Sequence, residues 1–261
     1  MDLGLAGKRA VVTGASKGIG LAVARALAAE GVHIVAGSRQ SSTELKELVS
    51  KGDATDVQVD LASETGPSRL VRAALDGGPL DILINNAGGV TPRTGGSESV
   101  TDEQWSYSIN LTLMAAVRTA RAVVPHMIER GRGAIVNTAS VNASLPDPFV
   151  IDYSAAKAAL VNFSKALSKE VGPRGIRVNT VSPGPVATDL WLGKEGVAST
   201  LSGSLGGSPS DYEQGAVAGT ATRRFTTPQE VADLIVFLAS DRSGNITGVD
   251  YIIDGGLTQS L

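Results

Sequence analysis

The sequence predicts an α/β fold, in which a doubly wound, mostly parallel sheet of seven strands carries helices on both of its faces. Short apolar segments rich in β-branched residues alternate with longer helical segments along the chain, and such alternation implies parallel strands. The first apolar segment leads directly into a glycine-rich turn and an alanine-rich helix. The 261 residues show no internal repeat and no separate second unit, so one domain, 1–261, is expected.

The expected strands are short, and most are apolar runs that end close to a glycine or a polar residue. They span 8–13, 33–37, 56–59, 82–85, 134–138, 177–181 and 249–254. Glycine and proline mark the helix limits: Gly131 ends one helix, and Pro228 suits the first turn of another. The expected helices occupy 21–30, 63–76, 102 to about 130, a segment through Tyr153 and Lys157 to about 171, and 228 to about 240.

The turn after the first strand predicts a nucleotide site. Residues 13–20 read Thr-Gly-Ala-Ser-Lys-Gly-Ile-Gly. Glycines let the backbone approach a pyrophosphate, and the start of the following helix offers free N–H groups and a positive dipole end. A glycine cluster alone could be only a tight turn. The strand before it and the helix after it favour the first half of a dinucleotide-binding βαβ unit.

Tyr153 and Lys157 form the most informative pair of polar residues. They lie four residues apart, so the phenol and the ammonium project from the same face of a helix. A positive charge beside a phenol lowers its pKa, and we expect this to make Tyr153 a proton donor and acceptor near neutral pH. Ser140 follows the expected strand 134–138. Taken alone, such a pair is more often a surface tyrosine beside a solvated lysine.

These motifs, in this order, resemble those of the short-chain dehydrogenase/reductases over nearly the whole chain. Residues 13–20 match T-G-x-x-x-G-x-G, residues 85–88 match N-N-A-G, and Pro183-Gly184 matches the P-G after the sixth strand. The resemblance implies a Rossmann-type sheet and hydride transfer between a nicotinamide and a carbonyl or secondary alcohol of a small organic substrate. It also implies four catalytic residues, which are Asn110, Ser140, Tyr153 and Lys157.

The resemblance gives each of the four a role. Tyr153 would give its proton to the new alkoxide in the reductive direction, and Ser140 would position the carbonyl oxygen. Lys157 would tune Tyr153 and hold the nicotinamide ribose hydroxyls. Asn110 would hold a water that links Lys157 to solvent, through a local helix kink.

The cofactor contacts expected from the resemblance lie at the carboxyl ends of the strands or on the segments that follow. They are Gly14, Ser16, Lys17, Gly18, Ile19, Gly20, Ser38, Arg39, Asp60, Leu61, Asn86, Ala87, Gly88, Tyr153, Lys157, Pro183, Gly184, Val186 and Thr188. Asp60 is expected to contact the adenine, although an aspartate at a strand end can also simply cap a turn.

The end of the second expected strand favours NADP(H) over NAD(H). An NAD-preferring site usually has an acidic residue there, which binds the ribose hydroxyls and would repel a 2′-phosphate. This chain has the neutral Ser38 followed by Arg39, and Lys17 adds a second cation from the glycine-rich turn. A guanidinium can bind a phosphate through two hydrogen bonds. The alternative is that Arg39 is a solvated loop residue.

Residues 189–225 interrupt the regular alternation and contain a stretch rich in glycine and serine. A long break without obvious structure is usually a lid over a site or a disordered insertion. The break begins just after Pro183-Gly184, where short-chain dehydrogenase/reductases have their substrate loop. The resemblance therefore implies that it is a substrate-binding lid. Its candidate pocket residues are Trp191, Leu192 and Tyr212. The alternative is a tolerated surface insertion.

Composition narrows the possible partners. The net charge is −3 and no basic block is present, which argues against nucleic acid and anionic lipid as partners. Cysteine is absent, no apolar run approaches the length of a membrane span, and the N-terminus has no signal-peptide pattern, so we expect a cytoplasmic protein. His33 and His126 stand outside any cluster with metal-ligand spacing, so no metal site is expected. The resemblance implies a homotetramer (or a homodimer).

Two other functions stay open at this stage. One is a 3-oxoacyl-(acyl carrier protein) reductase, in which Arg130, Arg132 and Arg174 would form a basic patch for an acidic carrier protein. The same arginines can also be an ordinary solvated face. The other is a non-catalytic NADP-binding sensor on the same fold, because a fold alone does not decide activity.

Overall fold

The computed structural model describes residues 2–259 and contains one parallel sheet of seven strands in the order β3-β2-β1-β4-β5-β6-β7. The chain crosses between β3 and β4 to the other side of β1, as in a doubly wound sheet. The Rossmann-type fold expected from the sequence is therefore confirmed. The strands are β1 Arg9–Thr13, β2 His33–Ser38, β3 Ala54–Gln58, β4 Ile82–Asn85, β5 Gly133–Thr138, β6 Ile176–Pro183 and β7 Asp250–Ile253.

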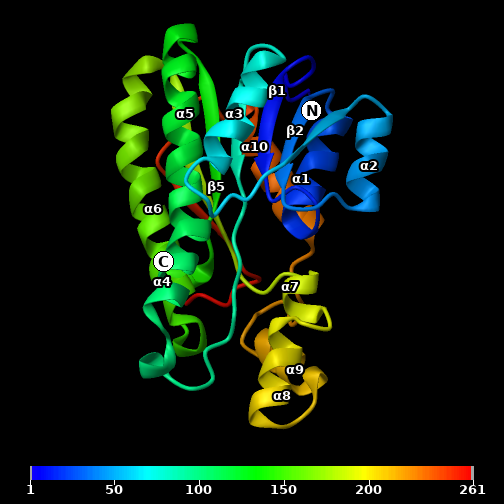
Figure 1. Cartoon of the computed structure of the whole chain (residues 1–261), viewed down its shortest axis with the longest axis vertical. Coiled ribbons are helices and arrows are strands. Elements are labelled where there is room, and N and C mark those ends of the chain that lie inside the picture. Colours follow the sequence, from blue (N-terminus) through cyan, green and yellow to red (C-terminus); the bar gives the residue numbers. More distant parts are fainter. Residues whose placement is uncertain (1, 260–261) are drawn as a thin grey trace.

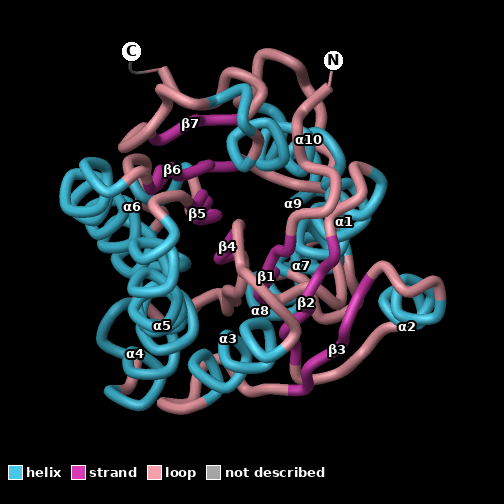
Figure 2. The backbone as a smooth tube through the Cα atoms, turned by 90° about the horizontal axis from the view of Figure 1, so that it is seen from above, coloured by secondary structure: helices cyan, strands magenta, loops and turns pink. Residues whose placement is uncertain are grey.

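Helices cover both faces of this sheet, as the view along its layers shows (Figure 2). One face packs on α1 and α10, and the other packs on α3, α5 and α6. The helices are α1 Gly18–Ala29, α2 Thr43–Ser50, α3 Gly66–Asp76, α4 Asp102–Ile109, α5 Ala115–Arg130, α6 Ile151–Val171, α7 Asp189–Leu192, α8 Val197–Leu205, α9 Pro209–Ala218 and α10 Pro228–Ala239.

Two apolar cores hold these layers together, because successive side chains of a strand point to opposite faces of the sheet. On β1, the buried Val12 contributes to the core under α1 and α10, whereas its buried neighbour Val11 contributes to the core under α3, α5 and α6. This explains why the strands read as nearly continuous apolar runs and not as alternating ones.

Four details differ from the expectations drawn from the sequence. The segment 189–225 is not irregular: it forms the three helices α7, α8 and α9 and lies at one end of the molecule (Figure 1). Helix α2 was not expected, and β3 begins and ends earlier than 56–59. The long helix expected over 102–130 is interrupted by a π-helical turn, Asn110–Met114, which separates α4 from α5.

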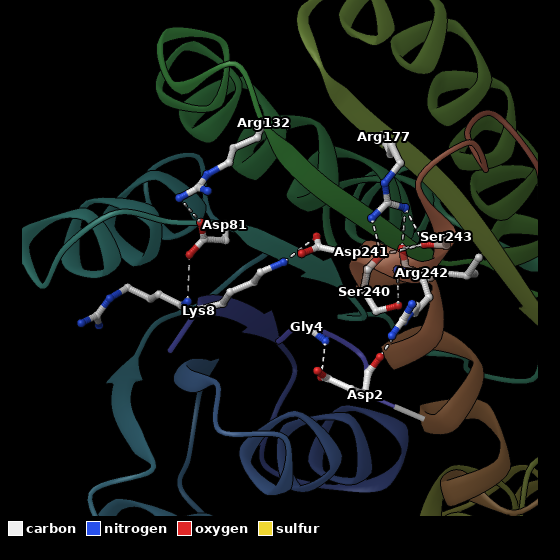
Figure 3. Close-up of polar contacts among 12 residues, drawn as sticks. Asp2, Gly4, Lys8, Asp81, Arg132, Arg177, Ser240, Asp241, Arg242 and Ser243 are labelled. Carbon is white, nitrogen blue, oxygen red and sulfur yellow. Dashed lines mark hydrogen bonds and ion pairs between the residues drawn. The ribbon is translucent and has the colours of Figure 1, made fainter. Parts of the chain in front are cut away.

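The opposite, amino edge of the sheet is closed by polar contacts between distant segments (Figure 3). Arg177 at the start of β6 donates to the carbonyl oxygens of Leu238 and Ser240 at 2.7 and 3.0 Å, so its cation lies where the dipole of α10 is negative. Lys8 pairs with Asp241 at 2.6 Å. These contacts lie away from the carboxyl edge of the sheet, which stays available for a ligand.

Among residues 2–259, none of the helices combines the length and the apolar character that a membrane span requires.

Candidate active site

A cavity of about 640 Å³ lies at the carboxyl edge of the sheet, under the segment 189–225. It brings together nearly all of the residues that the sequence proposed for the site, although these come from positions 14 to 188. Of the proposed catalytic and cofactor residues, only Gly20 and Asn110 do not line it. A cavity of this size and position suits a small organic ligand or cofactor, since such sites occur at the carboxyl ends of strands in open α/β sheets.

The glycine-rich turn after β1 forms the wall of one half of this cavity. Gly14 and Gly18 have φ angles of +69° and +56°, which side chains rarely tolerate. A Cβ at Gly20 would collide with the carbonyl oxygen of Gly14, so the third glycine lets α1 start close to the turn. No side chain caps α1 at Lys17, so its first amide groups remain available to an anion such as a phosphate.

Hydrogen bonds hold this turn against the end of β4. The Thr13 hydroxyl accepts from the backbone N–H groups of Asn86 and Ala87 at 2.9 and 3.0 Å. The Asn86 amide in turn donates to the Thr13 carbonyl oxygen at 3.2 Å. The first and fourth strands therefore present their ends to the cavity as one fixed surface.

The ends of β1, β2 and β3 bring two cations and one carboxylate to the same half of the cavity: Lys17, Arg39 and Asp60. Ser38 is buried and donates to the Gln40 carbonyl oxygen at 2.9 Å. Lys17 and Arg39 are exposed, and neither has an ion-pair partner within residues 2–259. Asp60 lines the cavity, but it also accepts from Ala62 N at 3.0 Å, so the simple turn-capping role applies to it as well.

Ser140, Tyr153 and Lys157 meet in the middle of the cavity lining. Lys157 is 3% exposed, and its ammonium donates to the Thr138 carbonyl oxygen at 2.6 Å. The same nitrogen lies 5.5 Å from the centre of the Tyr153 ring. Beside them, the hydroxyl of Thr138 is buried and has no hydrogen-bond partner among the described residues.

The pKa values of these groups correct one expectation. Burial raises the pKa of Tyr153 to about 12, although its hydrogen bond with Ser140 acts in the opposite direction. Burial also lowers the pKa of Lys157 to about 7. The lowered tyrosine pKa expected from a neighbouring ammonium is not found, because the loss of hydration on burial is the largest effect on this group. Tyr153 is thus a neutral phenol at pH 7, with a proton to donate.

Asn110 lies in the π-helical turn, but its side chain does not line the cavity and bonds to neighbouring residues of the same helical segment instead. Its amide nitrogen donates to the Ser106 carbonyl oxygen, and its amide oxygen accepts from Arg118, both at 2.9 Å. The kink that the family resemblance implies is therefore present, whereas the side chain is satisfied locally. Leu111, the next residue, does line the cavity.

Two sets of residues beside Ser140 and Tyr153 could not be predicted from the sequence. Asn142 accepts from the Ser140 hydroxyl at 3.3 Å and donates to Ser154 at 3.4 Å, beside the candidate proton donor. Asp152, which precedes Tyr153 and is 1% exposed, pairs with Arg93 at 2.5 Å and accepts from Ser108 at 2.7 Å. Spacing gives no signal for these contacts, because Arg93 and Asp152 are 59 positions apart.

Comparisons with known proteins decide the family. A family model described as Enoyl-(Acyl carrier protein) reductase matches residues 14–258. The human dehydrogenase/reductase SDR family member 4 is 33% identical, over 98% of this chain and 90% of the relative. The chain belongs to the short-chain dehydrogenase/reductase family. It is therefore an oxidoreductase of that family.

Other members of the short-chain dehydrogenase/reductase family are similar over the whole chain. The crystal structure of an L-sorbose reductase from Gluconobacter frateurii, complexed with NADPH and L-sorbose, is 38% identical with a TM-score of 0.90 and full coverage of both chains. A 3-oxoacyl-[acyl-carrier-protein] reductase from Synechocystis is 35% identical over 95% of this chain and 96% of the relative.

The lowered pKa of Lys157 predicts how the stability of this short-chain dehydrogenase/reductase depends on pH. Between pH 7 and pH 10, the folded protein loses the Lys157 proton while the unfolded chain keeps it, so stability rises with pH in this window. We expect the difference in free energy of unfolding between wild type and Lys157→Met to shift in favour of wild type, by at most about 1.4 kcal/mol per pH unit. Urea unfolding from pH 7 to 9.5 measures it, and a constant difference would contradict the assignment.

Proposed function

We propose that the protein is an NADPH-dependent reductase that transfers hydride between the nicotinamide and a carbonyl or secondary alcohol of a small organic substrate. The observation that carries this proposal is the convergence of Ser140, Tyr153 and Lys157 with the glycine-rich turn in one cavity. The NADPH-bound L-sorbose reductase, similar over its whole length, supports the cofactor and a carbonyl-reducing activity. NADPH oxidation with a panel of ketones and aldehydes, followed at 340 nm, tests it.

The residues of the cavity suit this cofactor. The free first turn of α1 and the close backbone at Gly14 fit a pyrophosphate, and Lys17 and Arg39 fit a 2′-phosphate. Gly88 leaves space beside the Lys157 ammonium, since a Cβ there would lie 3.5 Å from that nitrogen. The reduced nicotinamide, when bound, supplies the hydride.

The chain supplies the proton and the orientation. Ser140 holds the carbonyl oxygen of the substrate, and Tyr153 donates its phenolic proton to that oxygen as negative charge develops. A phenol whose pKa is raised to about 12 is fully protonated at neutral pH, which suits the reductive direction. Lys157 stabilises the negative charge left on Tyr153 and binds ribose hydroxyls.

We further propose that residues 189–225 are a lid over the bound substrate. Helix α8 packs chiefly on α7 and α9, and the two ends of the segment are held side by side by a bridge between Val186 and Thr226 and an edge-on contact of Trp191 with Phe225. A unit held at its two ends can move as a whole. We expect slower backbone hydrogen exchange in α8 and α9 once NADPH and a substrate are bound. Equal exchange with and without ligands would contradict the lid.

We also propose assembly into a homotetramer (or a homodimer). Apolar side chains are exposed on the edge strand β7 and just before it, as Ile252 and Val249, and on α4, as Tyr107 and Ile109. An exposed apolar strand at a sheet edge usually requires cover. Light scattering of the purified protein measures the mass of the assembly.

A carrier-protein reductase is the second candidate, because the Synechocystis relative has that name. Its basic patch is weakened, however: Arg130 pairs with Asp81 at 2.8 Å, and Arg132 approaches the same carboxylate at 3.9 Å. Asp81 precedes β4 and Arg132 precedes β5, so both arginines lie at the amino edge, opposite the cavity. Comparing a free thioester with a carrier-bound one separates the two functions, and turnover of either argues against an inactive nucleotide sensor.

A further inference from the structure

The charged side chains that line the cavity fall into three groups. Lys17, Arg39 and Asp60 belong to the half formed by the ends of β1, β2 and β3, which we assign to the nucleotide. Lys157 lies between the halves and is engaged with Thr138. The other two charged groups are carboxylates, one in the segment before α6 and one at the first residue of α7: Asp147 and Asp189.

We call the lining outside the nucleotide half the substrate half; apart from Lys157, its described residues carry two carboxylates and no cation. Two arginines close in sequence to lining residues are already paired, Arg93 with the buried Asp152 and Arg224 with Glu230. The rest of this wall is apolar or neutral. It comprises Asn142, Leu145, Phe149, Trp191, Leu201 and Leu257.

This distribution of charge has a direct consequence for the substrate. A carboxylate or phosphate that enters such a half loses hydration, finds no cation to pair with, and approaches groups of its own sign. An uncharged carbonyl compound has none of these costs, and the Asn142 amide offers both a donor and an acceptor to a neutral polar group.

We propose that the substrate is an uncharged carbonyl compound, and that Asp147 and Asp189 discriminate against carboxylated and phosphorylated analogues. The inference rests on the proposed function, because it takes Ser140, Tyr153 and Lys157 as the reacting centre. It goes further by assigning the charge class of the substrate to two residues for which the family motifs give no role.

Pairs of substrates that present the same ketone beside either an ester or an ionised carboxylate test this. Methyl pyruvate is compared with pyruvate, and ethyl acetoacetate with acetoacetate, at pH 7 with saturating NADPH and the full-length protein. We expect kcat/KM to be at least about tenfold higher for each ester than for its acid. Because the two carboxylates are exposed, the ratio should fall as NaCl is raised from about 0.05 to about 0.5 M, where screening is stronger.

Substitutions identify the groups responsible. The double variant Asp147→Asn, Asp189→Asn should lower the ester-to-acid ratio by at least about threefold, and an asparagine at 147 can still accept from Phe149 N, as Asp147 does at 2.8 Å. Asp76→Asn is the matched control: it removes the same charge at the exposed end of α3, outside the lining. Its ratio should equal that of wild type.

The outcomes are distinguishable. Acids reduced as efficiently as their esters, a ratio that does not respond to salt, or an unchanged ratio in the double variant would overturn the inference while leaving the proposed function intact. NADPH oxidation with none of the pairs and none of the broader carbonyl panel would instead overturn the proposed function, and this inference with it.

Discussion

Tyr153→Phe is expected to lower kcat for NADPH-dependent carbonyl reduction by about 10² to 10⁴-fold, the usual contribution of a positioned proton donor. The substitution keeps the ring that lines the cavity and packs near the Lys157 ammonium, but removes the only proton that the phenol can give. Steady-state kinetics measure the loss, and NADPH binding, followed by fluorescence, should stay close to that of wild type.

Tyr107→Phe is a matched control for this prediction. Tyr107 lies on α4, is 49% exposed and does not line the cavity, so the same chemical change there should leave kcat unchanged. A Tyr153→Phe enzyme that retains more than about a tenth of the wild-type kcat would show that another group donates the proton.

The second large effect concerns the choice of cofactor. Wild type should prefer NADPH to NADH by well over tenfold in kcat/KM, and the double variant Ser38→Asp, Arg39→Ala should reverse that order. A charge-assisted hydrogen bond contributes about 1.5–3 kcal/mol, so loss of Arg39 alone can cost roughly ten- to a hundred-fold with NADPH. The new carboxylate at position 38 adds repulsion of the 2′-phosphate and a partner for the ribose hydroxyls of NADH.

Kinetics with both cofactors at one fixed substrate concentration measure this preference. Arg72→Ala, which removes an exposed arginine on α3 outside the cavity, is the control and should change neither cofactor's kcat/KM. A wild-type enzyme that uses NADH as well as NADPH would contradict the roles of Ser38, Arg39 and Lys17.

The sequence predicted the sheet and most of the cavity lining for a physical reason. In a parallel sheet the carboxyl ends of all strands meet at one edge, so motifs such as residues 13–20 and 85–88 come together although they are far apart in the chain. Strand order and motif position suffice for that inference, and no knowledge of side-chain contacts is needed.

Properties that depend on burial or on distant contacts could not be predicted in this way. The pKa of Tyr153 moves upward because burial removes hydration, and burial follows from the whole fold and not from the spacing to Lys157. The helices of 189–225 have weak apolar periodicity and many small residues. One local signal was nevertheless present, since Ser208, Pro209 and Asp211 form the capping box and first turn of α9.

The pairing of Arg93 with the start of α6 also bears on how the chain acquires its active site. Two hydrogen bonds of Arg93 reach residues more than 50 positions later in the chain. Its backbone N–H donates to the Phe149 carbonyl oxygen at 2.6 Å, and its guanidinium donates to Asp152, 59 positions away. During synthesis, β1 to β4 leave the ribosome well before α6 does, and contacts between distant residues form late in folding. We therefore expect the glycine-rich turn to assemble against β4 while the nascent chain still lacks α6, and we expect circular permutants opened between β4 and α6 to refold more slowly than wild type.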